Sequence, residues 1–262
     1  MSIRSGFGAA RRKVLSSLYR RGVPLGDFGP IVSFTFDDFP RTAYTTGGAI
    51  LEQFGGRGTY YAAAGLMNTT NELGEQFRSE DIDSLLEKGH ELASHTFSHI
   101  SCRSVSEADF RAEVIKGGKA IKELAGLESP NFAYPYGHVT LQTKRSLELY
   151  VSSARSILPG FNEPEVDLNL LRANSLYGDL EVFKRAEELV LENTKRKSWL
   201  IFYTHDVRTN PSPYGCTAAL FESVVSFAAR SGSRILTVQE VLSEVGAQNA
   251  CTKGQAQCAG LR

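Results

Sequence analysis

The chain has 262 residues, of which 42% are hydrophobic, 22% charged and 10% aromatic. This is an ordinary globular composition, and it excludes a disordered chain, a collagen-like repeat and a coiled coil. Because 29 Lys and Arg residues balance 29 Asp and Glu residues, no strong overall field would recruit nucleic acid. The length fits one large domain or two small ones.

The N-terminal segment, residues 1–26, is strongly basic. It carries six basic side chains and no acidic one: Arg4, Arg11, Arg12, Lys13, Arg20 and Arg21. No apolar stretch of signal-peptide length follows them and no run of 18 apolar residues occurs, so we expect a cytoplasmic protein without a membrane-spanning helix. Residues 14, 15, 18 and 19 fall on one helical face. This pattern fits peripheral contact with an anionic surface at the inner membrane face or a helix packed across the main domain.

Short apolar runs alternate with amphipathic segments along the rest of the chain. The predicted strands are Ile31–Phe36, Arg57–Ala62, Glu91–Ser94, Phe132–Tyr134, Tyr150–Ala154, Leu168–Arg172, Trp199–Tyr203 and Arg234–Leu236. The predicted helices are Thr42–Phe54, Ser79–Lys88, Glu107–Leu124, Leu141–Leu149, Leu180–Asn193, Cys216–Arg230 and Val238–Val245. This alternation predicts parallel strands with helical crossovers. About seven units favour a complete or incomplete α/β barrel, while the pattern alone also fits an open sheet. We expect the barrel over residues 27–246 and a tail over 247–262.

Polar residues that directly follow the predicted strands are the candidates for chemistry, because ligands gather at the carboxyl ends of parallel strands. Asp37 and Asp38 follow the first strand, His95 and His99 the third, and His205 the strand at Trp199. Two histidines and one aspartate can bind a divalent ion and leave positions open, while the second aspartate acts as a general base. Each signal alone has a plainer interpretation, such as surface histidines or a turn; their combination is specific.

These residues belong to motifs that resemble those of a known family. The motifs are Thr35-Phe36-Asp37-Asp38, His95-Thr96-Phe97-Ser98-His99, Tyr134-Pro135-Tyr136-Gly137 and Tyr203-Thr204-His205-Asp206. In order and spacing, from about residue 31 to about residue 242, they resemble the motifs of the polysaccharide deacetylases, carbohydrate esterases that act on N-acetylated glycans such as chitin and peptidoglycan. The resemblance implies a distorted (β/α) barrel of about seven strands.

The resemblance also implies a role for each motif residue. Asp37 is expected to be the general base, Tyr136 to supply a backbone N–H to the oxyanion, and His205 to be the general acid. Asp38, His95 and His99 are the expected metal ligands. We expect a divalent metal, with zinc as the first choice because amide hydrolysis needs a Lewis acid without redox chemistry; the same ligands suit iron, cobalt or nickel.

Two positions depart from the family pattern. Many members carry an arginine two residues before the motif proline, where it pairs with the catalytic aspartate, but this chain has Ala133 there. Arg172, at the end of a predicted strand, is our candidate substitute, although a solvated arginine is an equally good interpretation. Tyr203 stands where a leucine usually lines the pocket for the acetyl methyl group, so the acyl pocket is expected to differ in shape.

Three functions remain open at this point. The first is a metal-dependent N-deacetylase acting on a sugar or glycan, in polysaccharide or lipid-linked glycan biosynthesis. The second is a hydrolase of another amide or of a cyclic imide or ureide on the same barrel. The third is an inactive glycan-binding module, against which the retained Asp37 and His205 argue.

Overall fold

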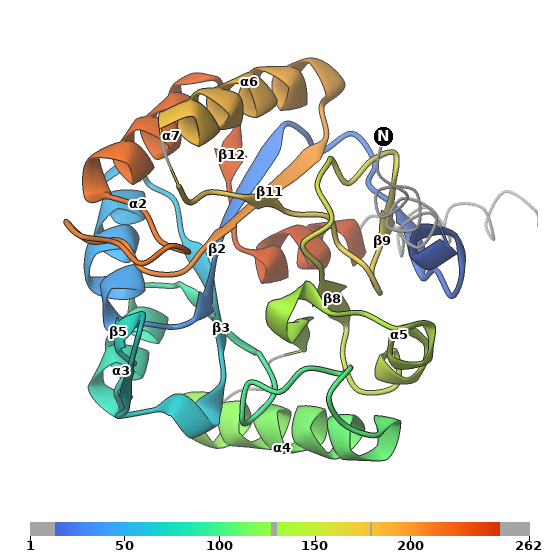
Figure 1. Ribbon diagram of the computed structural model, residues 1–262. Helices are drawn as coiled ribbons and strands as arrows, with labels where there is room; N and C mark the ends of the chain where they lie inside the picture. Colours follow the sequence, from blue (N-terminus) through green and yellow to red (C-terminus); the bar gives the residue numbers. More distant parts are fainter. Residues whose placement is uncertain (1–13, 127–129, 179, 247–262) are drawn as a thin grey trace, which may run out of the picture.

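One curved, parallel sheet forms the centre of the molecule. The computed structural model describes residues 14–126, 130–178 and 180–246. Seven strands follow one another across this sheet in the order β10-β11-β2-β3-β6-β7-β8, and a further short strand, β12, pairs with β2. The sheet curls into an incomplete barrel with helices around it (Figure 1). The predicted distorted (β/α) barrel is therefore confirmed.

The strands of this sheet are short except for two at its centre. They are β2 (Ile31–Asp38), β3 (Gly58–Ala62), β6 (Glu91–Ser94), β7 (Asn131–Ala133), β8 (Ser153–Arg155), β10 (Asn174–Ser175), β11 (Trp199–Thr204) and β12 (Arg234–Ile235). Every residue of β2 and β11 is buried. Strands buried on both faces read as continuous apolar runs, which is why these two were recognisable in the sequence.

The helices lie outside the sheet and match the predicted segments closely. They are α2 (Ala49–Gln53), α3 (Ser79–Glu87), α4 (Glu107–Ala125), α5 (Leu141–Leu147), α6 (Leu180–Arg196) and α7 (Ala218–Arg230), and residues 238–246 are also helical. The longest, α4, begins after Ser106, whose side chain accepts a hydrogen bond from the Asp109 N–H, and ends at Gly126 with a φ of 66°. A polar N-cap and a left-handed glycine are the usual local signals for these two boundaries.

The alternation of side chains along β2 separates the core from the barrel interior. Val32, Phe34 and Phe36 point outward into the main hydrophobic core, which also contains the α7 side chains. Ser33 instead accepts a hydrogen bond of 2.9 Å from the indole N–H of Trp199. Because strand side chains alternate with a period of two, Asp37 lies on the same face as Ser33 and points into the barrel.

Three local details differ from the sequence predictions. Residues 43–48 form a π-helix before α2, where a single α-helix was expected. Strand β8 begins at Ser153 rather than at Tyr150. The strand predicted at Leu168–Arg172 is wrong, because only Leu171 forms an isolated bridge, with Arg155. Asp167 accepts hydrogen bonds from Asn169 N–H at its side chain and from Leu170 N–H at its carbonyl, and these bonds form a turn where the strand was expected.

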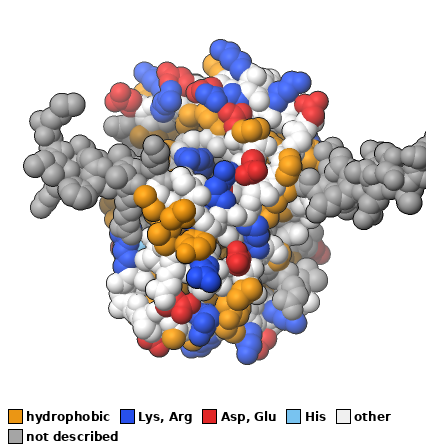
Figure 2. Space-filling view, turned by 90° about the vertical axis from the view of Figure 1, so that its right-hand side faces the viewer, with side chains coloured by type: hydrophobic (Ala, Val, Ile, Leu, Met, Phe, Trp, Pro, Cys, Tyr) orange, Lys and Arg blue, Asp and Glu red, His pale blue; other side chains and the backbone are white. Residues whose placement is uncertain are grey.

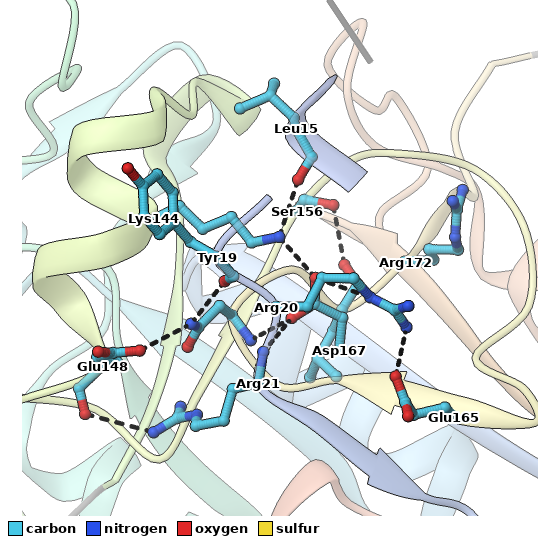
Figure 3. Close-up of polar contacts among 12 residues, drawn as sticks. Leu15, Tyr19, Arg20, Arg21, Lys144, Glu148, Ser156, Glu165, Asp167 and Arg172 are labelled. Atoms are coloured by element: carbon cyan, nitrogen blue, oxygen red, sulfur yellow. Dashed lines mark hydrogen bonds and ion pairs between the residues drawn. The ribbon is translucent and has the colours of Figure 1, made fainter. Parts of the chain in front are cut away.

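The described part of the N-terminal segment, residues 14–26, packs against α5, β9 (Glu165–Asp167) and the residues before β8. Strand β1 (Gly22–Pro24) pairs antiparallel with β9. Figure 3 shows that the buried ammonium of Lys144 donates to the carbonyl of Leu15 at 2.8 Å and to Asp167 at 2.6 Å. The guanidinium of Arg21 donates to the carbonyls of Val151 and Ser152 at 3.0 and 2.6 Å.

The described residues 14–26 are therefore packed against the main domain. Leu15 is buried, whereas Val14, Leu18 and Tyr19 are about half exposed. This face of the molecule carries hydrophobic side chains among charges of both signs (Figure 2). Peripheral membrane contact stays a prediction, and residues 1–13 and 247–262 lie outside the described residues. No helix among the described residues has the length and the apolar character needed to cross a membrane.

We expect Lys144→Met to loosen the N-terminal segment. The substitution leaves the largely buried Asp167 carboxylate with only the longer, 4.0 Å contact to Arg20, and removing one partner of a buried pair costs about 3 kcal/mol. Hydrogen exchange at the β1 and β9 amides should then become about 100-fold faster, as mass spectrometry of the corresponding peptides can measure. The exposed Lys195→Met in α6 is the matched control. Equal exchange rates in the two variants would show that the ion pair does not hold the segment.

Candidate active site and metal centre

Seven of the eight strands of the sheet, all but β12, lead into one pocket of about 500 Å³ at their carboxyl ends. The pocket is lined by Asp37, Asp38, Leu66, Asn71, Glu72, Leu73, His95, Ser98, His99, Tyr136, Gly137, Ile157, Tyr177, Tyr203, His205 and Tyr214. These side chains are on, or directly after, β2, β6, β7, β8, β10 and β11, and on the connection that follows β3. This is the end of a parallel barrel where active sites occur.

Asp38, His95 and His99 form a compact group inside the pocket. One ligand atom from each lies within 4.8 Å of the other two. The Nε2 atoms of His99 and His95 are 3.0 and 3.5 Å from the same Asp38 oxygen, Oδ1. The sequence placed these three residues after two different strands, and the parallel pairing of β2, β3 and β6 brings the strand ends together.

The three side chains fit a bound cation. The Nδ1–H of His95 donates to the carbonyl of Ala133 at 2.8 Å, so its Nε2 presents a lone pair to Asp38. Burial lowers the pKa of His95 to about 3, which keeps this imidazole neutral. The buried Asp38 Oδ1 has no hydrogen-bond partner among the described residues. A carboxylate oxygen and an imidazole lone pair that face each other without a proton are the donors of a divalent-metal site.

Backbone strain is concentrated at this pocket. Eight non-glycine residues in the described part of the chain have positive φ, and five of them lie in or next to the motif residues: Asp38, Phe39, Thr96, His99 and Tyr136. Each such conformation costs about 1–3 kcal/mol and persists only where the surrounding structure enforces it. At Asp38 the φ of 62° ends the alternation of β2, so that two consecutive carboxylates can serve the same pocket.

Asp37 is paired with a buried arginine that the sequence analysis did not identify. The Nη2 of Arg155, at the end of β8, donates to Asp37 Oδ1. The Arg155 guanidinium lies 5.1 Å from the ring centres of both Tyr61 and Tyr203. Burial by itself would raise the pKa of Asp37, but the charge of Arg155 and its hydrogen bond outweigh burial and lower it. Asp37 is therefore ionised, as a general base must be.

The proposed pairing of Arg172 with Asp37 is corrected by this arrangement. The Arg172 side chain donates to the carbonyl of Pro159 at 3.0 Å and does not line the pocket; in Figure 3 it points away from the polar cluster around Asp167. Arg155 directly follows the predicted strand Tyr150–Ala154. Arg155 therefore satisfies the rule that polar residues directly after a strand are candidates. The sequence analysis instead proposed Arg172, at the end of the next predicted strand, as the partner of Asp37.

His205 lies across the pocket, within a group of tyrosines. Its Nδ1–H donates to the carbonyl of Tyr214 at 3.2 Å, which leaves Nε2 as the nitrogen available to a ligand. The rings of Tyr177 and Tyr214 lie 6.4 and 5.6 Å from its ring. The neighbouring Asp206 is fully buried and accepts hydrogen bonds from the backbone N–H and hydroxyl of Ser212, so it organises the loop that carries Tyr214.

Tyr136 contributes its ring and its backbone to the pocket. Its ring packs against His99, with 4.5 Å between ring centres, and 58% of its surface is exposed. The hydrogen bonds of this turn run from Gly137 N–H to Tyr134 O and from His138 N–H to Pro135 O. They leave out the amide of Tyr136, the group assigned to the oxyanion by resemblance.

Comparison with known proteins agrees with the resemblance in the motifs. The sequence model of the polysaccharide deacetylases matches residues 28–151, slightly less than half of the chain. Its sequence is 28% identical over 111 residues to the peptidoglycan-N-acetylglucosamine deacetylase of Bacillus cereus; this match covers 41% of the chain but only 37% of that protein. The resemblance found in the motifs is confirmed.

Solved structures share the fold over more than four fifths of the chain. A Mycobacterium smegmatis protein assigned provisionally to the polysaccharide deacetylases has a TM-score of 0.63 and 16% identity, covering 87% of this chain and 94% of its own. A family 4 acetyl xylan esterase from Clostridium thermocellum, in complex with a cobalt ion, has a TM-score of 0.55 and 16% identity, covering 82% and 91%. At this level of identity the likeness concerns the fold.

Asp38→Asn should weaken the binding of zinc to this protein by about 100-fold or more, because a neutral amide replaces the only anionic donor of the three. Competition against a chromophoric chelator at pH 7 measures the affinity for the metal alone. Ser98→Ala is a suitable control, since Ser98 lines the same pocket but offers no ligand to the group. Unchanged affinity in Asp38→Asn would rule out this metal site.

Arg155→Met should lower the free energy of unfolding by about 3 kcal/mol, because the buried Asp37 carboxylate loses its cation. Arg172→Met, which removes an arginine outside the pocket, should change it by less than about 0.5 kcal/mol. Urea titrations at pH 7 compare the two variants directly. A larger loss in Arg172→Met than in Arg155→Met would contradict the assignment of Arg155 as the partner of Asp37.

Proposed function

We propose that this protein is a metal-dependent N-deacetylase that hydrolyses the acetamide group of an amino sugar in an oligosaccharide or polysaccharide. The observation that carries the proposal is the ionised Asp37, held by Arg155, directly beside the group formed by Asp38, His95 and His99. A separate base and a three-ligand metal group in one pocket are what amide hydrolysis requires. The activity of the Bacillus cereus relative supports the same reaction.

The cation would be held by Asp38, His95 and His99. Such an ion, with zinc as the first choice and iron, cobalt or nickel as alternatives, would polarise the acetamide carbonyl and make water more acidic. The cobalt ion bound to the acetyl xylan esterase of similar fold supports a divalent metal. A pocket with two neutral imidazoles and one carboxylate leaves coordination positions for water and substrate.

The protein side chains would divide the proton transfers between two faces of the substrate. Asp37 takes a proton from the attacking water, and Arg155 keeps Asp37 ionised for this step. The Tyr136 N–H donates to the oxygen of the acetamide carbonyl as negative charge develops there, a contribution of about 3–4 kcal/mol for one donor. His205 delivers a proton from Nε2 to the departing amine while Nδ1 stays bonded to the carbonyl of Tyr214. Acetate and a free amino sugar are the products.

His205→Gln should reduce kcat for acetate release by about 1000-fold while KM changes by less than about threefold, because the proton is needed only as the C–N bond breaks. The assay uses N-acetylglucosamine oligomers with an enzyme-coupled measurement of acetate. The metal content of the variant, by elemental analysis, should equal that of the wild-type protein, since His205 is not one of the three ligands.

The same assay separates the alternatives. Opening of cyclic ureides or imides without acetate release would favour the second function, a hydrolase of another amide on this barrel. Stoichiometric metal with no turnover of any acylated glycan would favour an inactive glycan-binding module. A role in polysaccharide or lipid-linked glycan biosynthesis, a cytoplasmic location and the domain limits at residues 26 and 246 remain predictions from the sequence.

A further inference from the structure

The rim of the pocket carries a carboxylate that the proposed chemistry does not use. Glu72 lies at the tip of the hairpin formed by β4 (Thr70–Asn71) and β5 (Gly74–Glu75), and it lines the pocket together with the neighbouring residues Asn71 and Leu73. Its side chain is exposed. In the described part of the chain no lysine or arginine lines this pocket, and no ion-pair partner of Glu72 is found there.

The hairpin tip that carries Glu72 is held in place by hydrogen bonds. The side-chain oxygen of Asn71 accepts the N–H of Leu73 at 2.9 Å and the side-chain amide of Gln76 at 3.0 Å. Leu73 is buried beneath the tip. The guanidinium of Arg208 donates to the backbone carbonyl of Glu72 at 3.3 Å. These hydrogen bonds hold the backbone on either side of Glu72 in place, while its carboxylate forms no ion pair within the described residues.

The nearby cations are all committed to other carboxylates. Arg208 forms an ion pair of 2.8 Å with the buried Asp206. At the base of the hairpin, Arg41 and Arg78 pair with Glu75, at 3.5 and 3.0 Å. Arg155, which is fully buried and does not line the pocket, is bound to Asp37. Glu72 therefore places a negative charge, unpaired in the part of the chain that the structure describes, at the rim of the pocket, apart from the charges deeper inside.

Glu72 and the exposed rings of Tyr136 and Tyr214 line the same pocket. Tyr136 and Tyr214 are 58% and 51% exposed at this pocket. Exposed tyrosine rings offer an apolar face and a polar hydroxyl, so a second sugar unit that rests on them lies within the field of Glu72.

We infer that Glu72 selects glycans by the charge of the sugar next to the one that is deacetylated. This inference rests on the proposed function. A neighbouring unit that already has a free amine is cationic and gains a charge-assisted contact with Glu72, and a neutral N-acetylated unit offers hydroxyl groups. A neighbouring unit with a carboxylate, such as a lactyl ether, meets a like charge and is rejected. The substrate class is thus a neutral or partly deacetylated amino-sugar oligomer.

The test compares three tetrasaccharides of N-acetylglucosamine type: one fully acetylated, one with a free amine on one unit, and one with lactyl carboxylates on alternate units. Acetate release gives kcat/KM for each substrate with the wild-type enzyme, Glu72→Gln and Glu72→Lys. Glu87→Lys, at the exposed end of α3 and outside the pocket lining, is the control that makes the same change in net charge as Glu72→Lys.

The wild-type enzyme should rank the amine-bearing substrate first and the carboxylate-bearing one last. Glu72→Gln should lower the ratio of kcat/KM between the amine-bearing and carboxylate-bearing substrates by about fivefold, which corresponds to the loss of one exposed ion pair. Glu72→Lys should lower it by about tenfold or more, and 0.5 M salt should shrink the wild-type ratio. Glu87→Lys should keep the wild-type ratio.

Two results would overturn the inference in distinguishable ways. In the first, the wild-type enzyme releases acetate, but the ratio of kcat/KM between the amine-bearing and carboxylate-bearing substrates is the same in all four proteins. This result would show that Glu72 is not the selecting residue and would leave the proposed function intact. No acetate release from any of the three substrates by metal-loaded wild-type enzyme would remove the proposed function and the inference with it.

Discussion

Asp37 and Asp38 are adjacent in the chain and both buried, and the structure must keep both carboxylates charged in one pocket. Burial raises the pKa of Asp38 to about 6, and the neighbouring charge of Asp37 adds to this effect. Asp37 is stabilised by Arg155, which lies between two tyrosine rings. Asp38 faces two imidazoles instead. The two acids therefore meet different partners, and different partners give them different chemistry.

Much of this arrangement could be predicted from the sequence because it depends on local patterns. The buried runs of β2 and β11 identify the central strands, and the alternation with helices gives parallel connections. Because parallel strands end at the same edge of a sheet, the sequence pattern predicts that Asp38, His95 and His99 lie close together. The motif resemblance added the roles of Asp37, Tyr136 and His205.

The remaining features depend on contacts that a pattern does not encode. Arg155 is a single basic residue after a three-residue strand, and only the curvature of the sheet brings its side chain to Asp37 across the barrel. The segment at Leu168–Arg172 has the composition of a strand, but hydrogen bonds to Asp167 turn its backbone instead. Residues 14–26 read equally well as a membrane-facing helix or a packed one, because the deciding partners, Lys144 and Asp167, are more than a hundred residues away.

The position of Arg155 near the far edge of the sheet has a consequence for the order in which the protein is made. Asp38, His95 and His99, the proposed metal ligands, leave the ribosome before Arg155, and His205 leaves last. Residues 28–151, which match the family model, end just short of Arg155. Because N-terminal parts of a chain fold first during synthesis, the nascent chain holds the three proposed ligands before it holds the cation that balances Asp37. Metal captured at that stage would stabilise the first strands while the rest of the barrel is still being translated.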